Sequence, residues 1–275
     1  VVTLPRTESS ISPSHLQFGF DLAYLVRKLQ SEGNTISSPF FGAIGITSCV
    51  MGHSMGGGAS FLAAQSDSTI TAIANLAAAE TNPSAIGAAG NLIIPVLVFS
   101  GSEDCVAPPA SHQLPMYTGL SSDCKAFISI IGGSHCKFGE YNFTCNLGEI
   151  GCPGSITRSA QHSLVIFHLL PFLDFHLKQA STARCVFQER LEAQNGITYL
   201  QECALPAVQN LTIQWSPNGV VLQWSPVFAG CAYDLLRAEE AVFEYDTLLR
   251  IYSGPASFFE DTISAERAFY RVWVK

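Results

Sequence analysis

The sequence predicts an α/β fold with a mostly parallel sheet, followed by a small all-β domain, and two patterns carry this prediction. Over the first two thirds, short continuous apolar runs alternate with helical segments, as in a parallel sheet covered on both faces. The runs occupy residues 70–76, 94–100 and 126–131, and helical segments at 110–120 and 155–178 lie between or after them. Over the last third, Leu211, Ile213 and Trp215 alternate with polar residues before a turn at 217–219, which indicates a β-hairpin.

Size and composition are those of a globular protein with a sizeable core. The chain has 275 residues, of which 48% are hydrophobic and 13% are charged. A net charge of −8, with 14 basic against 22 acidic residues and no basic run, argues against nucleic acid as a partner. The longest apolar stretches fall short of the roughly 20 residues that a transmembrane helix needs, so we expect none. The 9 cysteines indicate an oxidising compartment. We therefore expect a secreted protein whose signal peptide is not part of this sequence.

The first elements of the chain lead into a glycine-rich turn. Apolar residues from Phe18 to Leu29 recur at helical spacing, and an apolar strand is predicted at residues 45–51. An alanine-rich helix is predicted at 55–65. Between strand and helix stands Gly52-His53-Ser54-Met55-Gly56, a G-x-S-x-G pattern whose glycines allow the chain to turn sharply. This context predicts that Ser54 is an exposed nucleophile at the tip of the turn.

Two further polar residues follow the next strands at the same edge of the predicted sheet. Asp104 comes after the strand at 94–100, and His135 comes after the strand at 126–131. Functional groups of parallel sheets gather at the carboxyl ends of the strands, and the chain order Ser, Asp, His is that of α/β-hydrolases. Taken alone, Asp104 could be a helix cap and His135 a structural histidine. Their joint placement favours a catalytic triad, in which His135 accepts the proton of Ser54 and Asp104 orients the imidazole.

Three segments of the sequence carry a family resemblance. VMGHSMGGGAS, PVLVFSGSEDCVAPP and IIGGSHC resemble the cutinase-like polyester hydrolases, a group of the α/β-hydrolase superfamily that includes bacterial PET hydrolases. The resemblance covers about residues 1–203. It implies a secreted carboxylic-ester hydrolase with Ser54 as nucleophile, His135 as general base and Asp104 as its orienting residue. It also implies an oxyanion hole formed by the backbone N–H of Met55 and a second N–H on an earlier loop.

The sequence departs from this family in two places. The stretch at residues 79–84 lacks the tryptophan that stacks on aromatic substrate in PET hydrolases. Only 53 residues precede Ser54, whereas the family has several more strands there. We therefore expect that the first strands and the loop with the second oxyanion donor are missing. The isolated chain is then expected to be weakly active and to associate through an exposed sheet edge.

The cysteines predict three disulfides. Cys105 follows Asp104 and Cys136 follows His135, so a triad that joins these loops also brings the two thiols together. We predict a Cys105–Cys136 bridge, which resembles an extra active-site disulfide of some PET hydrolases, and a Cys145–Cys152 bridge beside it. The resemblance implies Cys185–Cys203 as the family's C-terminal disulfide. The remaining three cysteines, Cys49, Cys124 and Cys231, are expected to be free.

The domain organisation predicted is a catalytic domain at 1–180, a disulfide-clipped connection at 181–206 and a β-sandwich at 207–275. The sandwich resembles a fibronectin type III module, which serves as a spacer or as an attachment to a polymer or cell surface. We expect Trp215 and Trp224 to fill its core. The spacing of His135, Cys136, Cys145 and Cys152 fits no common zinc pattern, so we expect neither a metal nor a cofactor.

Three functions are compatible with these residues. The first is a serine esterase that cleaves polyesters or short- and medium-chain esters. The second is a chlorophyllase-like or lipase-like esterase with a bulky alcohol leaving group. The third is a catalytically weak, hydrolase-derived binding protein that carries an adhesion module. The sequence does not rank the ester substrates, because the pockets for the acyl and alcohol groups are lined by residues far apart in the chain.

Overall fold

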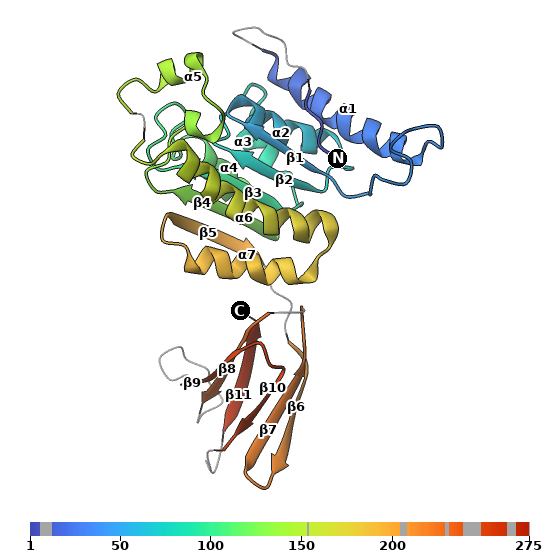
Figure 1. Ribbon diagram of the computed structural model, residues 1–275, viewed down its shortest axis with the longest axis vertical. Coiled ribbons are helices and arrows are strands. Elements are labelled where there is room, and N and C mark those ends of the chain that lie inside the picture. The colour runs from blue at the N-terminus through green and yellow to red at the C-terminus, as the bar shows by residue number, and fades with distance from the viewer. Residues whose placement is uncertain are drawn as a thin grey trace. The chain divides into compact units, whose positions relative to one another are not determined.

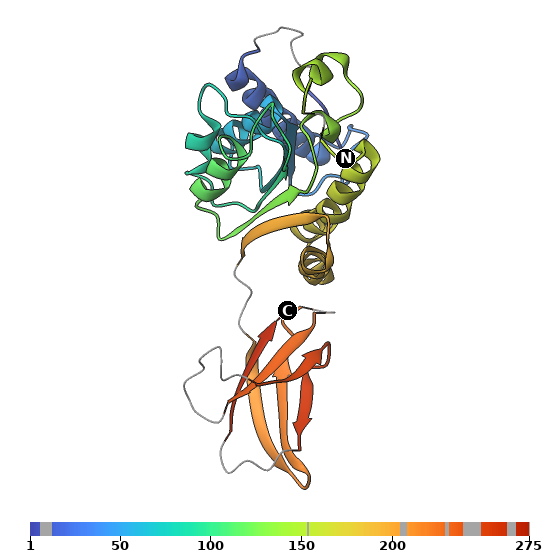
Figure 2. The ribbon, with the colours of Figure 1, turned by 90° about the vertical axis from the view of Figure 1, so that its left-hand side faces the viewer.

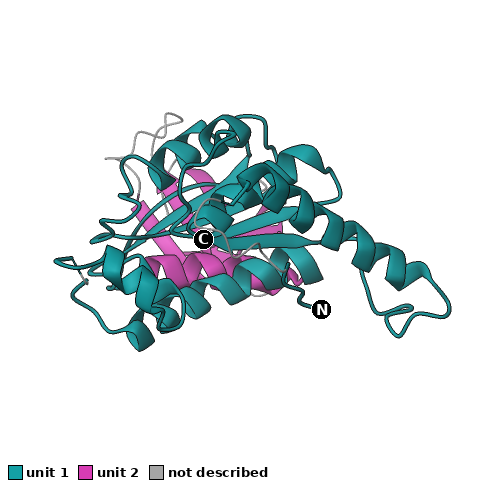
Figure 3. Ribbon diagram, turned by 90° about the horizontal axis from the view of Figure 1, so that it is seen from above, with its two compact units in different colours: residues 1–179, 194–203 teal, residues 180–193, 204–275 magenta. Residues whose placement is uncertain are grey.

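The protein consists of two compact units. The computed structural model describes residues 1–5, 13–152, 154–203, 208–228, 231–238, 249–262 and 268–274. Unit 1 comprises Val1–Gln179 and Gln194–Cys203, and unit 2 comprises Ala180–Ala193 and Ala204–Lys275 (Figure 3). The segment predicted as a connection, 181–206, is thus divided between the two units.

Unit 1 is built on one five-stranded sheet with the order β1-β2-β3-β4-β5 (Figure 1). The first four strands are parallel, and the last is antiparallel to its neighbour. They are β1 (Cys49–His53), β2 (Ala72–Leu76), β3 (Val96–Gly101), β4 (Cys124–Ile130) and β5 (Ile197–Cys203). Strands β2 and β3 are almost fully buried, in accord with their continuous apolar sequences. A mostly parallel sheet with flanking helices fits the predicted α/β-hydrolase fold.

Helices cover both faces of this sheet. Figure 2 shows α6 on the opposite face from α3 and α4. The helices of unit 1 are α1 (His15–Asn34), α2 (Met55–Ser66), α3 (Ala85–Ala89), α4 (Gln113–Gly119), the 3₁₀ turn η1 (Cys136–Phe138), α5 (Phe143–Gly148) and α6 (Arg158–Lys178). In the part of the chain that the structure describes, none of the helices combines the length and the apolar composition that crossing a membrane requires.

The helix after the serine turn, α2, is the most deeply buried of these elements. Every residue from Gly56 to Ala64 is buried, because glycine and alanine let neighbouring backbone approach closely. A Cβ at Gly58 would lie 2.3 Å from the carbonyl oxygen of Ala79, and one at Gly57 would lie 2.7 Å from the Cβ of Ala78. The glycine run after Ser54 is therefore a packing requirement as well as a turn signal.

Unit 2 contains α7 (Ser181–Ala193) and two three-stranded sheets with the orders β10-β7-β6 and β11-β8-β9. Both sheets are antiparallel. The strands are β6 (Gln209–Ser216), β7 (Gly219–Ser225), β8 (Tyr233–Ala238), β9 (Leu249–Gly254), β10 (Phe258–Asp261) and β11 (Phe269–Val274). The predicted hairpin is confirmed, because β6 and β7 pair with Trp215 opposite Val220. The likeness to a fibronectin type III module stays a prediction.

The two tryptophans of this hairpin have different surroundings. Trp224 is 2% exposed and packs with Leu222, Tyr233 and Leu235 in the core of unit 2, as predicted. Trp215 is 86% exposed, so the prediction of a core position was wrong for it. The reason is its place on the edge strand β6, whose residues are nearly all exposed, whereas Trp224 lies on the central strand β7.

Two disulfides outside the site differ from the prediction. Cys203 pairs with Cys124 rather than with Cys185, because these residues lie directly opposite each other on the antiparallel strands β4 and β5. Cys185 pairs with Cys231, and both belong to the buried core of unit 2. The predictions of a Cys185–Cys203 bridge and of free thiols at Cys124 and Cys231 were therefore wrong. Cys49 is a free thiol, as predicted.

Candidate active site

The serine turn has a strained backbone conformation. Ser54 joins β1 to α2 with φ 57° and ψ −125°, values that a residue with a side chain rarely adopts. Its N–H donates to the carbonyl of Leu76 at 3.1 Å, and its own carbonyl accepts the N–H of Ala79 at 2.8 Å. A Cβ at Gly52 would lie 2.1 Å from the carbonyl carbon of Gly56. The first glycine of the G-x-S-x-G pattern, Gly52, is therefore what allows this turn to close.

Met55 is the first residue of α2. The first N–H groups of a helix have no acceptor within the helix and lie at the positive end of its dipole. The Met55 N–H is thus placed directly after Ser54, where an oxygen that gains negative charge would be stabilised. Its role in an oxyanion hole stays a prediction.

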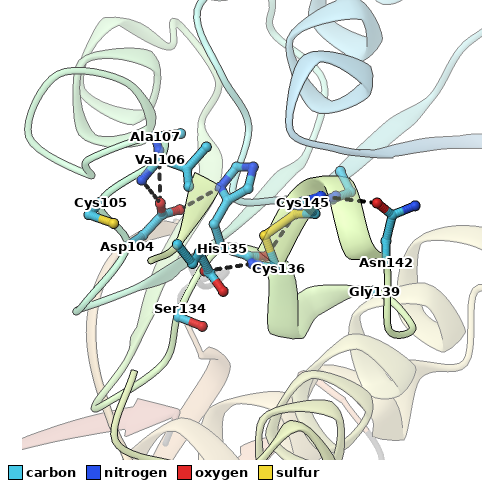
Figure 4. Close-up of a disulfide and its surroundings, with 12 residues drawn as sticks. Asp104, Cys105, Val106, Ala107, Ser134, His135, Cys136, Gly139, Asn142 and Cys145 are labelled. Carbon is cyan, nitrogen blue, oxygen red and sulfur yellow. Dashed lines mark hydrogen bonds and ion pairs between the residues drawn. A yellow bond between two sulfur atoms is a disulfide. The ribbon is translucent and has the colours of Figure 1, made fainter. Parts of the chain in front are cut away.

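Asp104 and His135 lie together, as the sequence predicts. His135 Nδ1 is 2.8 Å from Asp104 Oδ2, and the two residues are 1% and 4% exposed. The other carboxylate oxygen, Oδ1, accepts the N–H groups of Val106 and Ala107 at 2.9 and 2.8 Å (Figure 4). These two bonds fix the carboxylate, so that it holds His135 with Nδ1 protonated and leaves Nε2 as a proton acceptor.

Ser54 and His135 line the same pocket, which has a volume of about 480 Å³. His53 and Val106 also line it. Residues from the segment between η1 and α6 line it as well, among them Glu140, Asn142 and Thr144. We call residues 139–152 the wall segment. The predicted nucleophile and base thus line one pocket together with a segment that sequence reasoning did not identify.

His53, the second residue of the G-x-S-x-G pattern, contacts the candidate base directly. Its Nε2 lies 3.0 Å from the carbonyl oxygen of His135, and the two ring centroids are 4.6 Å apart. Burial and the neighbouring His135 lower the pKa of His53 to about 4, so it is neutral near pH 7. A neutral ring facing a carbonyl carries its proton on Nε2 and donates it. The motif offered no signal for this contact, because the position is a free x in the pattern.

Gln161, from α6, was also missed. It is fully buried, and its amide makes two hydrogen bonds to the backbone of Ser134: Oε1 accepts the N–H at 3.0 Å, and Nε2 donates to the carbonyl at 2.8 Å. Both backbone polar groups of Ser134, the residue before His135, are therefore held by one side chain. A glutamine in a helix interior gives no hint of this role in the sequence.

The four cysteines around the site pair differently from the prediction. Cys136 bonds to Cys145, and Cys105 bonds to Cys152, so the predicted Cys105–Cys136 and Cys145–Cys152 bridges were wrong. Asp104 and His135 direct their side chains toward each other, whereas Cys136, after His135, bonds to Cys145 of the wall segment (Figure 4). Cys105, after Asp104, bonds to Cys152 of the same segment. Because Cys136, Cys145 and Cys152 are all in disulfides, they have no thiolate to offer a metal ion.

Comparisons with known proteins find similarity to ester hydrolases. A family described as PET hydrolase-like matches residues 16–151, which include Ser54, Asp104 and His135. The chain is 37% identical over 96 residues to a bis(hydroxyethyl) terephthalate hydrolase of Streptomyces coelicolor, which is 34% of this chain and 30% of that protein. It is 33% identical over 87 residues, 31% of this chain, to Cutinase 1 of Thermobifida cellulosilytica and to a cutinase of Thermobifida fusca, covering 32% and 28% of these proteins. The chain spans about a third of the length of these relatives. The three candidate catalytic residues lie within the part of the chain that is similar to PET hydrolase-like proteins.

Proposed function

We propose that the protein is a secreted serine hydrolase that cleaves carboxylic esters, either polyesters or short- and medium-chain esters, through an acyl-enzyme. The observation that carries this proposal is the 2.8 Å contact between His135 Nδ1 and Asp104 Oδ2 beside a pocket that Ser54 also lines. The similarity to cutinases and to a terephthalate-ester hydrolase supports the substrate class. The four disulfides fit an extracellular protein.

The reaction proposed has two halves. In the first, Ser54 Oγ attacks the ester carbonyl while His135 Nε2 takes its proton, and the Met55 N–H donates to the oxyanion. His135 then gives the proton to the leaving alkoxide, so that an alcohol departs and the acyl group stays on Ser54. In the second half, His135 removes a proton from water, which attacks the acyl-enzyme, and His135 returns that proton to Ser54 Oγ as the carboxylic acid is released. Asp104 stabilises the imidazolium in both halves.

Labelling with a fluorophosphonate tests the nucleophile. Such a probe phosphonylates an activated serine, so wild-type protein should carry the label on the peptide with Ser54. Ser54→Ala should abolish labelling, and Ser68→Ala, at an exposed serine between α2 and β2, should not. Label on another serine, or none on a folded protein, would contradict the proposal.

A panel of esters then separates the substrate classes. Hydrolysis of p-nitrophenyl butyrate and of an insoluble polyester film supports the polyesterase. Turnover restricted to esters with a bulky alcohol favours the chlorophyllase-like or lipase-like alternative, and binding to a polymer without turnover favours the binding protein.

A further inference from the structure

The backbone that carries His135 is held by side chains from three directions. Gln161 from α6 bonds to Ser134, and His53 from β1 faces the carbonyl of His135 at 3.0 Å. The third contact comes from Glu149, whose Oε1 accepts the N–H of Cys136 at 2.8 Å. The residues before, at and after His135 are therefore each fixed by a partner distant in the sequence.

Glu149 is unusual among these partners, because it is a carboxylate that is only 4% exposed. Burying a carboxylate costs free energy unless it is paired or hydrogen-bonded. The bond that it accepts from Cys136 is charge-assisted, and such bonds are about twice as strong as those between neutral groups. A carboxylate directed at the N–H next to His135 therefore holds that N–H more firmly than a water molecule would.

Two disulfides fix Glu149 in place. It follows α5 on the wall segment, between Cys145, which bonds to Cys136, and Cys152, which bonds to Cys105. Cys136 and Cys105 are the residues directly after His135 and Asp104. The wall segment is thus covalently joined to both loops of the Asp104–His135 pair, and Glu149 is confined to a short stretch between the two bridges.

We propose that Glu149 is a positioning residue: its carboxylate, held by the two disulfides of the wall segment, fixes the backbone after His135 and so orients the imidazole between Asp104 and Ser54. This inference rests on the proposed ester hydrolysis, in which His135 is the base. Misplacement of a catalytic group by about 1 Å can cost 10²-fold in rate, so a loosened His135 should lower kcat while substrate binding persists.

Other charged groups surround the same loop. The guanidinium of Arg158 donates to the carbonyls of Cys136 and Gly139, and the Lys137 ammonium donates to the carbonyl of Gly154 at 3.1 Å. These cations bind backbone oxygens, whereas Glu149 binds a backbone N–H, so their substitution does not mimic that of Glu149.

Three substitutions separate the hydrogen bond from charge and from packing. Glu149→Gln keeps an acceptor at the same reach, Glu149→Asp retracts it by about 1.5 Å, and Glu149→Leu removes it. With p-nitrophenyl butyrate, kcat should fall less than about threefold for Gln, by roughly 3- to 10-fold for Asp and by about 10- to 100-fold for Leu. KM should stay within about threefold throughout. Asp123→Asn and Asp123→Leu, at an exposed carboxylate beside the start of β4, are the matched controls and should leave both constants unchanged.

A second readout does not depend on turnover. The proton between His135 Nδ1 and Asp104 should give a low-field NMR signal, identified by its loss in His135→Ala. The signal should persist in Glu149→Gln and broaden or disappear in Glu149→Asp, a variant that keeps the charge and nearly the volume. If wild-type protein shows this signal and its dependence on Glu149 but hydrolyses no ester, the proposed function fails while the positioning role stands. The positioning role would be overturned if Glu149→Asp and Glu149→Leu kept the wild-type kcat and an unchanged NMR signal. It would also be overturned if kcat fell equally in Glu149→Gln and Glu149→Leu.

Discussion

The two disulfides of the wall segment should contribute unequally to stability. Cys105 and Cys152 are 47 residues apart in the sequence, whereas Cys136 and Cys145 are 9 apart. On the chain-entropy estimate, closing the longer loop stabilises the folded state by about 4 kcal/mol and closing the shorter one by about 2.6 kcal/mol. Cys105→Ala with Cys152→Ala should therefore destabilise unit 1 more than Cys136→Ala with Cys145→Ala. Alanine is the replacement of choice because Cys136 is 2% exposed, and a buried hydroxyl would add a cost of its own.

Equilibrium unfolding in urea, followed by far-UV circular dichroism, measures the two losses. Each double variant keeps the other bridge, so peptide mapping without reductant should still find one intact disulfide in this region. A third variant, Cys105→Ala with Cys136→Ala, removes one cysteine from each bridge and should lose both native pairings. The pairing would be refuted if the first two variants had no native disulfide in this region and the third had one, between Cys145 and Cys152. Equal losses of stability in the first two variants would contradict the loop-entropy argument.

Three further predictions concern the core of the site. Asp104→Asn should lower kcat by roughly 10³- to 10⁴-fold with little change in urea midpoint, because Asn keeps the turn but not the imidazole tautomer; near-normal turnover would remove Asp104 from the triad. Gly58→Ala should cost about 1–3 kcal/mol or more in urea unfolding, since its Cβ would lie 2.3 Å from the Ala79 carbonyl, whereas Gly45→Ala, with its nearest neighbour at 3.9 Å, should be tolerated. The pKa of His53 is about 4 in the folded protein, against an ordinary 6.5, so the folded state disfavours protonation of the ring. The contribution of neutral His53 to the free energy of unfolding is therefore fully present above pH 6.5 and falls by about 3 kcal/mol as the pH drops to 4. His53→Gln should flatten that part of the stability–pH curve, and an unchanged slope would mean that the ring is not buried as a neutral donor.

The fold of unit 1 could largely be predicted, because its central strands have a sequence signature. The strands β2 and β3 are apolar throughout and buried on both faces, so they stand out in the sequence. The strand β5 was missed because it is antiparallel, half-exposed and has only a weak alternation. Helix α7 was missed within a segment that was taken for a connection. The helix at 155–178 was anticipated despite an internal proline, Pro171.

The candidate site was predictable where a residue lies in the loop that follows a strand. Ser54, Asp104 and His135 satisfy this condition, and the parallel sheet brings their loops to one edge. The partners of the His135 loop, Gln161 and Glu149, come from elements whose path cannot be derived from spacing. The prediction of the disulfides at the site failed for a related reason. Four cysteines allow three pairings, and adjacency to Asp104 and His135 does not fix the direction of a thiol. Attachment of unit 2 to a polymer stays a prediction.

The Cys185–Cys231 bridge has a consequence for how the chain is made. The chain enters unit 2 at Ala180, returns to unit 1 for β5 and then enters unit 2 again at Ala204. During synthesis from the N-terminus, Cys185 leaves the ribosome 46 residues before its partner, while Cys124 and Cys203 can already pair. The thiol of Cys185 must therefore stay reduced, or be released from a wrong partner, until the strands of unit 2 exist. Efficient production should depend on a disulfide isomerase, and a chain ended at Cys203 would keep a complete sheet in unit 1 and leave Cys185 unpaired in addition to the free Cys49.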